Sequence, residues 1–236
     1  RAVAMSFVGD PGDGDEAADA VRALGAEPIP LLADVADEAA CRATVAAVAR
    51  YGRIDALFNN AGTTVFVPSH SDLDAVSAED FDRIFRVNVT GAYLMTRAAR
   101  SLLEAAPLPG AVVNTSSFAA FGGLGSSVPY AASKGAMNTM TFALARALAP
   151  KIRVNAICPG FMDSKWFKGL NQADMADLRE NIAATMPMQV ASKPEDIAGA
   201  AVFLASRAAL HITGETLLVD AGLHLGGSFS TKLRSE

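Results

Sequence analysis

The sequence has few of the residues that build disulfide frameworks, metal centres or nucleic-acid surfaces. Two cysteines, Cys41 and Cys158, stand in 236 residues, which is too few for a fold stapled by disulfides. The three histidines are scattered without ligand spacing, so we expect no zinc site. Lys and Arg number 20 against 25 Asp and Glu and form no basic run, which argues against nucleic acid as a partner.

Long hydrophobic runs are also missing. No apolar run reaches the roughly 18 residues of a membrane-spanning helix, and no secretory signal peptide is visible. We therefore expect no membrane partner and a cytoplasmic location, where reduced cysteines are usual. What the chain does contain is 51% hydrophobic and 19% charged residues, a balance typical of globular enzymes.

Short apolar runs alternate with helical patterns along the chain. The apolar runs cover residues 2–8, 29–33, 54–58, 111–115, 152–158 and 216–220. The helical patterns cover 16–25, 38–50, 77–105, 129–149 and 194–206, while 161–192 has a broken helical pattern that we interpret as a loop. Because the strands are continuous apolar runs, the pattern predicts a mostly parallel sheet with helices on both faces. We predict one doubly wound, Rossmann-like α/β domain over residues 1–236.

Special residues follow four of the predicted strands. Asp34 follows the second strand, Asn59-Asn60 the third, Ser116-Ser117 the fourth and Pro159-Gly160 the fifth. Parallel sheets bind ligands at the carboxyl ends of their strands. The four strand ends therefore predict a ligand site at that edge of the sheet.

Tyr130 and Lys134 are four residues apart on a predicted helix, so their side chains share one face. A phenol ionises near pH ~10, and a neighbouring ammonium lowers that pKa, which gives a proton donor or acceptor. Ser117, brought in from a strand end, could orient a carbonyl beside the phenol. The spacing Tyr-x-x-x-Lys also arises by chance on many helices, so the assignment depends on the strand-end residues.

These residues, taken in order, resemble the short-chain dehydrogenase/reductase family of the ~250-residue type. The matching stretches are Ala33-Asp34-Val35, Asn59-Asn60-Ala61-Gly62, Asn88 within 87–91, 114–117, 130–134, 153–160 and 212–220. The resemblance covers nearly the whole chain. It implies an oxidoreductase that uses NAD or NADP to interconvert a small-molecule carbonyl and a secondary alcohol.

The resemblance implies a role for each matching residue. Tyr130 would be the general acid or base, and Ser117 would position the substrate oxygen. Lys134 would lower the pKa of the tyrosine and hold the nicotinamide ribose, and Asn88 would support a proton-relay water. Asn88 could instead be a polar group inside a helix that bonds to backbone. The implied cofactor contacts are Asp34, Val35, Asn60, Ala61, Gly62, Tyr130, Lys134, Pro159, Gly160, Met162 and Ser164.

The family's first strand and glycine-rich turn have no match in this sequence. We expect either that a strand–helix unit of roughly thirty residues is missing from the front of the chain, or that the protein is a degraded relative of the family. A loose dinucleotide fingerprint, Gly12-x-Gly14-x-x-Ala17, follows the first apolar run. Four carboxylates surround it, at positions 10, 13, 15 and 16, and they would repel a pyrophosphate. We interpret this stretch as a solvated acidic loop.

Two regions bear on the substrate and on assembly. Residues 161–192 hold Trp166 among several Phe and Met residues and are interpreted as a partly apolar lid, or alternatively as a packed helical hairpin. The alanine-rich helix at 129–149 permits close helix packing, and the resemblance implies a homo-oligomer, a dimer or tetramer. A non-catalytic relative that serves as a binding or assembly module is the alternative to an enzyme.

Overall fold

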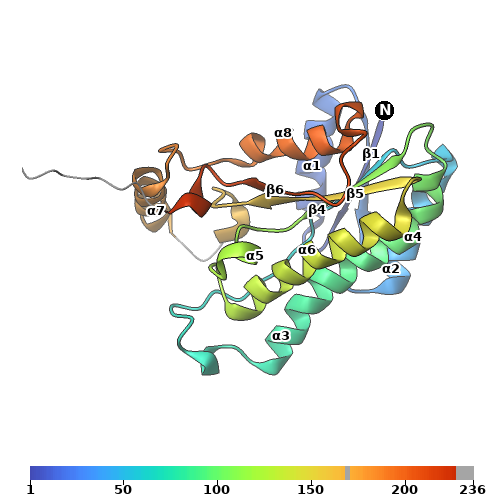
Figure 1. Cartoon of the computed structure of the whole chain (residues 1–236). Helices are drawn as coiled ribbons and strands as arrows, with labels where there is room; N and C mark the ends of the chain where they lie inside the picture. The colour runs from blue at the N-terminus through green and yellow to red at the C-terminus, as the bar shows by residue number, and fades with distance from the viewer. Residues whose placement is uncertain (168–170, 227–236) are drawn as a thin grey trace, which may run out of the picture.

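The structure, a computed structural model, describes residues 1–167 and 171–226 (Figure 1). The strands are β1 (Ala2–Phe7), β2 (Glu27–Leu32), β3 (Ala56–Asn59), β4 (Gly110–Thr115), β5 (Ile152–Pro159) and β6 (Thr216–Val219). The α-helices are α1 (Pro11–Ala23), α2 (Glu38–Val48), α3 (Ala78–Phe85), α4 (Ala92–Glu104), α5 (Ala119–Gly122), α6 (Val128–Leu148), α7 (Gln172–Thr185) and α8 (Pro194–Ala205). A π-helical segment, Arg86–Gly91, joins α3 to α4.

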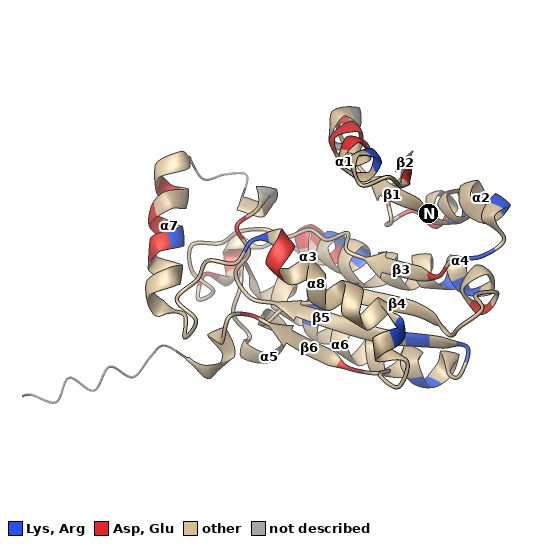
Figure 2. Cartoon of the chain, turned by 90° about the horizontal axis from the view of Figure 1, so that it is seen from above, with Lys and Arg blue, Asp and Glu red and all other residues tan. Residues whose placement is uncertain are grey.

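Every strand pairing in the structure is parallel, which confirms the Rossmann-like α/β prediction. The strands nevertheless form two sheets, β1–β2 and β3–β4–β5–β6, and not the single sheet that we predicted. Figure 2 shows the β1–β2 pair and α1 set apart from β3 and β4. Among the described residues no strand pairs with the facing edges of β1 and β3. Val3 on β1 and Phe58 on β3 are accordingly 40% and 45% exposed.

Two hydrophobic cores cover the two faces of the four-stranded sheet. Val112 of β4 and Val154 of β5 are fully buried in the core that α2, α4 and α6 complete. Val113, one residue along β4, packs with Ile197 and Leu204 of α8 on the opposite face. Successive residues of a strand point to opposite faces, so the continuous apolar runs in the sequence supply both cores. Figure 1 shows α8 on one face and α4 and α6 on the other.

Three predicted elements differ from the structure. The long helix at 77–105 is interrupted by the π-helical segment that carries Asn88. The acidic stretch after β1 forms the N-cap and the first two turns of α1 and not a loop, because the Asp10 carboxylate caps the helix by accepting from the Gly12 amide at 2.8 Å. Residues 172–185, which we predicted as part of a loop, form α7. Its side chains are mostly exposed, so it lacks the apolar stripe by which helices are recognised in sequence.

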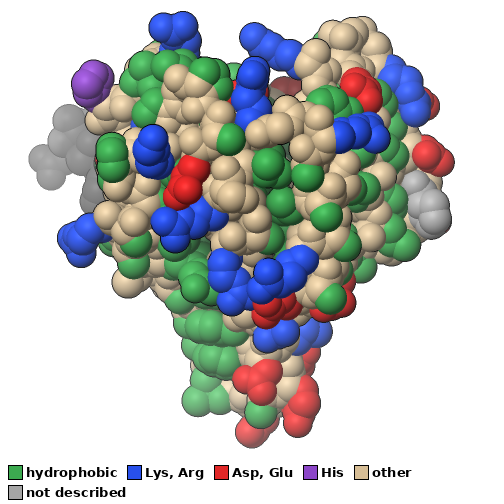
Figure 3. All heavy atoms as spheres, turned by 90° about the vertical axis from the view of Figure 1, so that its right-hand side faces the viewer, with side chains coloured by type: hydrophobic (Ala, Val, Ile, Leu, Met, Phe, Trp, Pro, Cys, Tyr) green, Lys and Arg blue, Asp and Glu red, His purple; other side chains and the backbone are tan. Residues whose placement is uncertain are grey.

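The end of the molecule opposite the carboxyl ends of the strands carries scattered charge. Figure 3 views this end, and Lys and Arg side chains are spread over it between hydrophobic ones. Across residues 1–167 and 171–226, no helix is long and apolar enough to cross a membrane.

Candidate active site

The carboxyl ends of β3, β4 and β5 bring the predicted residues to one edge of the sheet. Asn59 pairs in register with Asn114, and Thr115 pairs with Ile157. Asn60 follows β3, where its side-chain oxygen accepts from the Thr115 hydroxyl at 3.0 Å. Because parallel strands end at the same edge, these residues surround one site.

Buried polar side chains hold this edge together. The Asn59 side-chain amide donates to Asn114 Oδ1 at 2.9 Å and to Thr96 Oγ1 at 3.0 Å. Asn114 in turn donates to Thr141 Oγ1 of α6 at 2.9 Å. This network joins β3, β4, α4 and α6, and each group has a partner, as buried polar groups require. Asn59 therefore has a structural role, and the sequence did not indicate its connection to Thr141.

Lys134 lies within the first turns of α6 and is almost completely buried, with 4% of its surface exposed. Its Nζ donates to the backbone oxygen of Thr115 at 2.8 Å and lies 5.6 Å from the centre of the Tyr130 ring. Burial lowers the pKa of Lys134 from 10.5 to about 8, because a charge is costly to desolvate. An ammonium has three N–H donors, and Thr115 takes one of them.

Tyr130 lies beside Ser117, with which it forms a hydrogen bond. Burial raises the pKa of the Tyr130 phenol above its usual value of 10, and a hydrogen bond with Ser117 partly opposes this shift. The expectation that Lys134 lowers this pKa is therefore wrong for this structure. The cost of burying a phenolate dominates this pKa, and the Lys134 ammonium donates to Thr115. Ser117 Oγ also accepts from the Ala119 amide at 3.1 Å.

Asn88 is completely buried on the π-helical segment. Its Oδ1 accepts from the Thr63 amide at 2.7 Å, and its Nδ2 donates to the Thr63 oxygen at 3.0 Å and to Ser133 Oγ at 3.0 Å. The side chain thus bonds to backbone, as in the alternative interpretation of Asn88. π-Helical turns are frequent at functional sites, and no spacing signal in the sequence indicated this one.

Gly62 and Trp166 lie next to the Tyr130–Lys134 pair. A Cβ placed on Gly62 would stand 3.5 Å from Asn88 Oδ1, 3.8 Å from Lys134 Nζ and 3.8 Å from Trp166 Cη2. The Trp166 and Tyr130 rings are 5.9 Å apart between centres. The sequence placed Trp166 in an apolar lid, but its contact with Tyr130 is visible only in the fold.

The end of β5 approaches the end of β6 closely. The Gly160 amide donates to the Val219 oxygen at 3.3 Å, and a Cβ on Gly160 would lie 2.8 Å from the Asp220 Cβ. Pro159 accepts from the Phe118 amide at 2.8 Å, which ties the end of β5 to the loop after Ser117. Packing thus requires a glycine at position 160.

The remaining predicted cofactor contacts are placed as follows. Asp34 is exposed after β2 and accepts from the Ala36 amide at 2.8 Å, whereas the Val35 side chain is buried in the core. Met162 packs against the core under α8, and Ser164 Oγ accepts from the Trp166 amide at 3.3 Å. Ala61 lies exposed between Asn60 and Gly62. Within the described residues, no group of His, Cys, Asp and Glu has the arrangement of a metal site.

Comparisons with known proteins agree with this architecture. A family model described as enoyl-(acyl carrier protein) reductase matches residues 2–224. A ketoacyl reductase named for the granaticin polyketide synthase of Streptomyces violaceoruber is 41% identical over 82% of this chain and 76% of its own length. L-rhamnose 1-dehydrogenase (NAD(P)(+)) of a Sphingomonas strain is 34% identical over 94% of this chain and 86% of its own.

A solved structure has the same fold. The crystal structure of a short-chain dehydrogenase/reductase from Burkholderia xenovorans superposes with a TM-score of 0.84 at 42% identity, covering 95% of this chain and 88% of that one. The chain therefore belongs to the short-chain dehydrogenase/reductase family and is an NAD(P)-dependent dehydrogenase/reductase.

Proposed function

We propose that the protein interconverts a carbonyl and a secondary alcohol, with Tyr130 as the general acid and base. The observation that carries this proposal is the convergence of three groups at one strand edge. The Tyr130 phenol hydrogen-bonds with Ser117, and the buried Lys134 Nζ lies 5.6 Å from the centre of the Tyr130 ring. A substrate oxygen placed between the phenol and the Ser117 hydroxyl would accept a hydrogen bond from each of them.

The residues at this edge fit a nicotinamide cofactor. Lys134 presents a buried ammonium with donors beyond the one bound to Thr115, which suits ribose hydroxyls. Gly62 has no side chain to fill the space beside that ammonium. When bound, the reduced cofactor supplies the hydride, and the protein supplies position and electrostatics.

The proton chemistry follows from the environment of Tyr130. Burial raises the pKa of the phenol above 10, so near neutral pH the phenol carries its proton. Tyr130 can then donate that proton to the oxygen of a carbonyl that is being reduced. In the oxidative direction the phenolate is required, so oxidation becomes faster as the pH rises toward the raised pKa. We therefore propose that reduction is the favoured direction of catalysis near pH 7.

The test is an activity assay with NADH and with NADPH against a panel of carbonyl compounds. The panel includes β-keto thioesters and aldoses, because the relatives named above are a ketoacyl reductase and a sugar dehydrogenase. Tyr130→Phe should lower kcat by about 10² to 10⁴ while the protein still folds, which is the usual contribution of general acid–base catalysis. Tyr51→Phe is the matched control, because Tyr51 is exposed and bonds to Glu27 on the surface. Equal turnover by Tyr130→Phe and wild type would remove Tyr130 from the mechanism.

We also propose that the protein forms a homo-oligomer through α4 and α6. Two large aromatic side chains on these helices are about half exposed, Tyr93 at 43% and Phe142 at 46%. Exposed aromatic side chains of this size are typical of protein interfaces. Light scattering on the purified protein should give at least twice the 24.4 kDa mass of one chain. A single-chain mass at micromolar concentration would contradict the proposal.

A further inference from the structure

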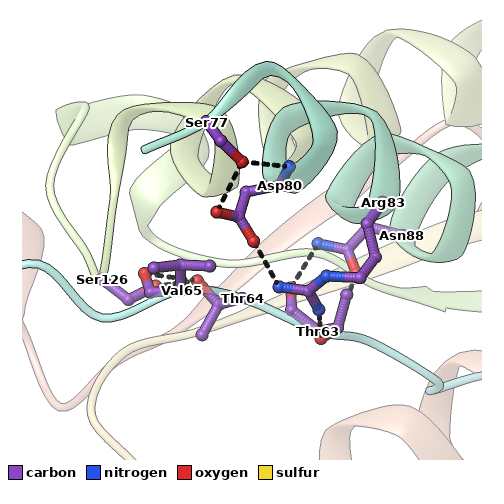
Figure 4. A network of polar contacts seen from close by, with 8 residues as sticks. All are labelled: Thr63, Thr64, Val65, Ser77, Asp80, Arg83, Asn88 and Ser126. Carbon is purple, nitrogen blue, oxygen red and sulfur yellow. Dashed lines mark hydrogen bonds and ion pairs between the residues drawn. The ribbon is translucent and has the colours of Figure 1, made fainter. Parts of the chain in front are cut away.

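We propose that Arg83 is a positioning residue for the active site, acting through Thr63 and Asn88 on the turn of α6 that carries Tyr130. This inference rests on the proposed function, since its kinetic consequence is a change in that activity. Arg83 lies on α3, outside every motif that pointed to catalysis. Hydrogen bonds connect it through Thr63 to Asn88, as Figure 4 shows, and further bonds lead from Asn88 to α6.

The first part of the series fixes the Arg83 guanidinium. One of its terminal nitrogens donates to Asp80 Oδ1 at 3.1 Å, and the other donates to Thr63 Oγ1 at 2.8 Å. Asp80 is itself held, because Ser77 Oγ donates to Asp80 Oδ2 at 2.9 Å while accepting from the Asp80 amide at 3.0 Å. The hydrogen bonds from Arg83 and Ser77 lower the pKa of the Asp80 carboxyl, so it stays ionised. The planar guanidinium therefore points at Thr63 in one orientation.

The second part joins Thr63 to Asn88. Both backbone polar groups of Thr63 bond to the one side-chain amide of Asn88, at 2.7 Å and 3.0 Å. A two-point contact of this kind couples the positions of the two residues, because neither can move without stretching a bond. Thr63 also follows Gly62, which lies beside Lys134 Nζ. A displacement of Thr63 is therefore transmitted to Asn88 and to Gly62 beside Lys134 Nζ.

The last part reaches Tyr130. Asn88 Nδ2 donates to Ser133 Oγ at 3.0 Å, and Ser133 Oγ donates to the backbone oxygen of Tyr130 at 2.7 Å. Asn88 and Ser133 are both completely buried, so water cannot replace these bonds easily. The series thus runs from the N-cap of α3 to the turn that carries the proposed general acid.

Arg83 adjusts the site and is not required for folding. Its side chain is 47% exposed, and exposed ion pairs add little to stability. The same loop has a second anchor, because the Thr64 hydroxyl bonds to the Ser126 hydroxyl and the Val67 amide donates to the Ser126 oxygen at 3.0 Å. Loss of Arg83 should shift Thr63 without unfolding the loop, and small displacements at an active site have large kinetic effects.

The kinetic test compares Arg83→Met and Arg83→Lys with Arg100→Met. Arg100 is a matched control, because it is an exposed helical arginine that pairs with Glu104 away from the site. We expect Arg83→Met to lower kcat about tenfold with KM changed less than twofold, Arg83→Lys to recover part of the loss, and Arg100→Met to match wild type. In a Thr63→Val background, Arg83→Met should have no further effect, because the hydroxyl through which it acts is gone.

A second measurement does not depend on activity. Hydrogen exchange of the Thr63 amide, which Asn88 holds, should become about tenfold faster in Arg83→Met and stay unchanged in Arg100→Met. Unchanged exchange and unchanged kcat in Arg83→Met would overturn the inference. A wild-type protein without turnover on any carbonyl would instead refute the proposed function, and the exchange experiment would still decide the role of Arg83.

Discussion

Replacing Lys134 by Met should change how the stability of the protein depends on pH. Lys134 is 4% exposed, and burial lowers its pKa from 10.5 to about 8. Below pH 8 the ammonium is charged in the folded and unfolded states, so folding carries the full cost of burying it. Between pH 8 and 10.5 the folded protein has released the proton that the unfolded chain still binds. The free energy of unfolding of the wild type therefore rises over this interval.

The size of the effect follows from the pKa shift. The difference between 10.5 and about 8 is about 2.5 units, and each unit corresponds to about 1.36 kcal/mol, which gives about 3 kcal/mol. Met has a similar volume but does not titrate, so it lacks this gain. Relative to Lys134→Met, the wild type should gain about 3 kcal/mol between pH 7 and 10.5, or roughly 6–12 °C in Tm for a chain of this length.

Urea unfolding followed by circular dichroism at several pH values from 7 to 10.5 measures this difference. Loss of the hydrogen bond to Thr115 changes the free energy of unfolding of Lys134→Met by an amount that does not depend on pH. The result is therefore read from how the free energy of unfolding changes with pH, and not from its absolute value. Lys151→Met serves as the control, because Lys151 is exposed and its substitution should give parallel curves. If the difference between wild type and Lys134→Met stays constant from pH 7 to 10.5, the ammonium is not desolvated as described and the reasoning fails.

Three further outcomes follow from the site. Reduction should keep a constant kcat up to about pH 8, where Lys134 begins to lose its proton, while oxidation rises with pH because burial raises the pKa of Tyr130; a fall in reduction centred near pH 7 would contradict this assignment. Gly160→Ala should lower the free energy of unfolding, measured in urea, by about 1–3 kcal/mol, because its Cβ would stand 2.8 Å from the Asp220 Cβ. An unchanged urea midpoint would show that the backbone at Asp220 can move aside at no cost in stability. Trp166, the one tryptophan of the chain, lies beside Tyr130 and Gly62, so its fluorescence should change on addition of NADH or NADPH but not of adenosine alone.

The sequence by itself determined the fold class and indicated the residues that we propose for the site. Continuous apolar runs on alternating segments predict a parallel sheet, because such strands must bury both of their faces. Residues at the strand ends and the Tyr130–Lys134 spacing indicate the active edge, because chain order determines where parallel strands end. These signals are local, so they can be recognised without any knowledge of packing.

Only the tertiary structure decided the properties that depend on burial and on distant contacts. The pKa of Tyr130 is raised and not lowered, because the depth of the phenol and the direction of the Lys134 ammonium depend on the surrounding strands. The division of the strands into two sheets, with no pairing between β1 and β3, depends on which strand edges lie side by side in the fold. The link from Arg83 to Asn88 joins residues through a loop twenty positions away, a pairing that no periodicity predicts.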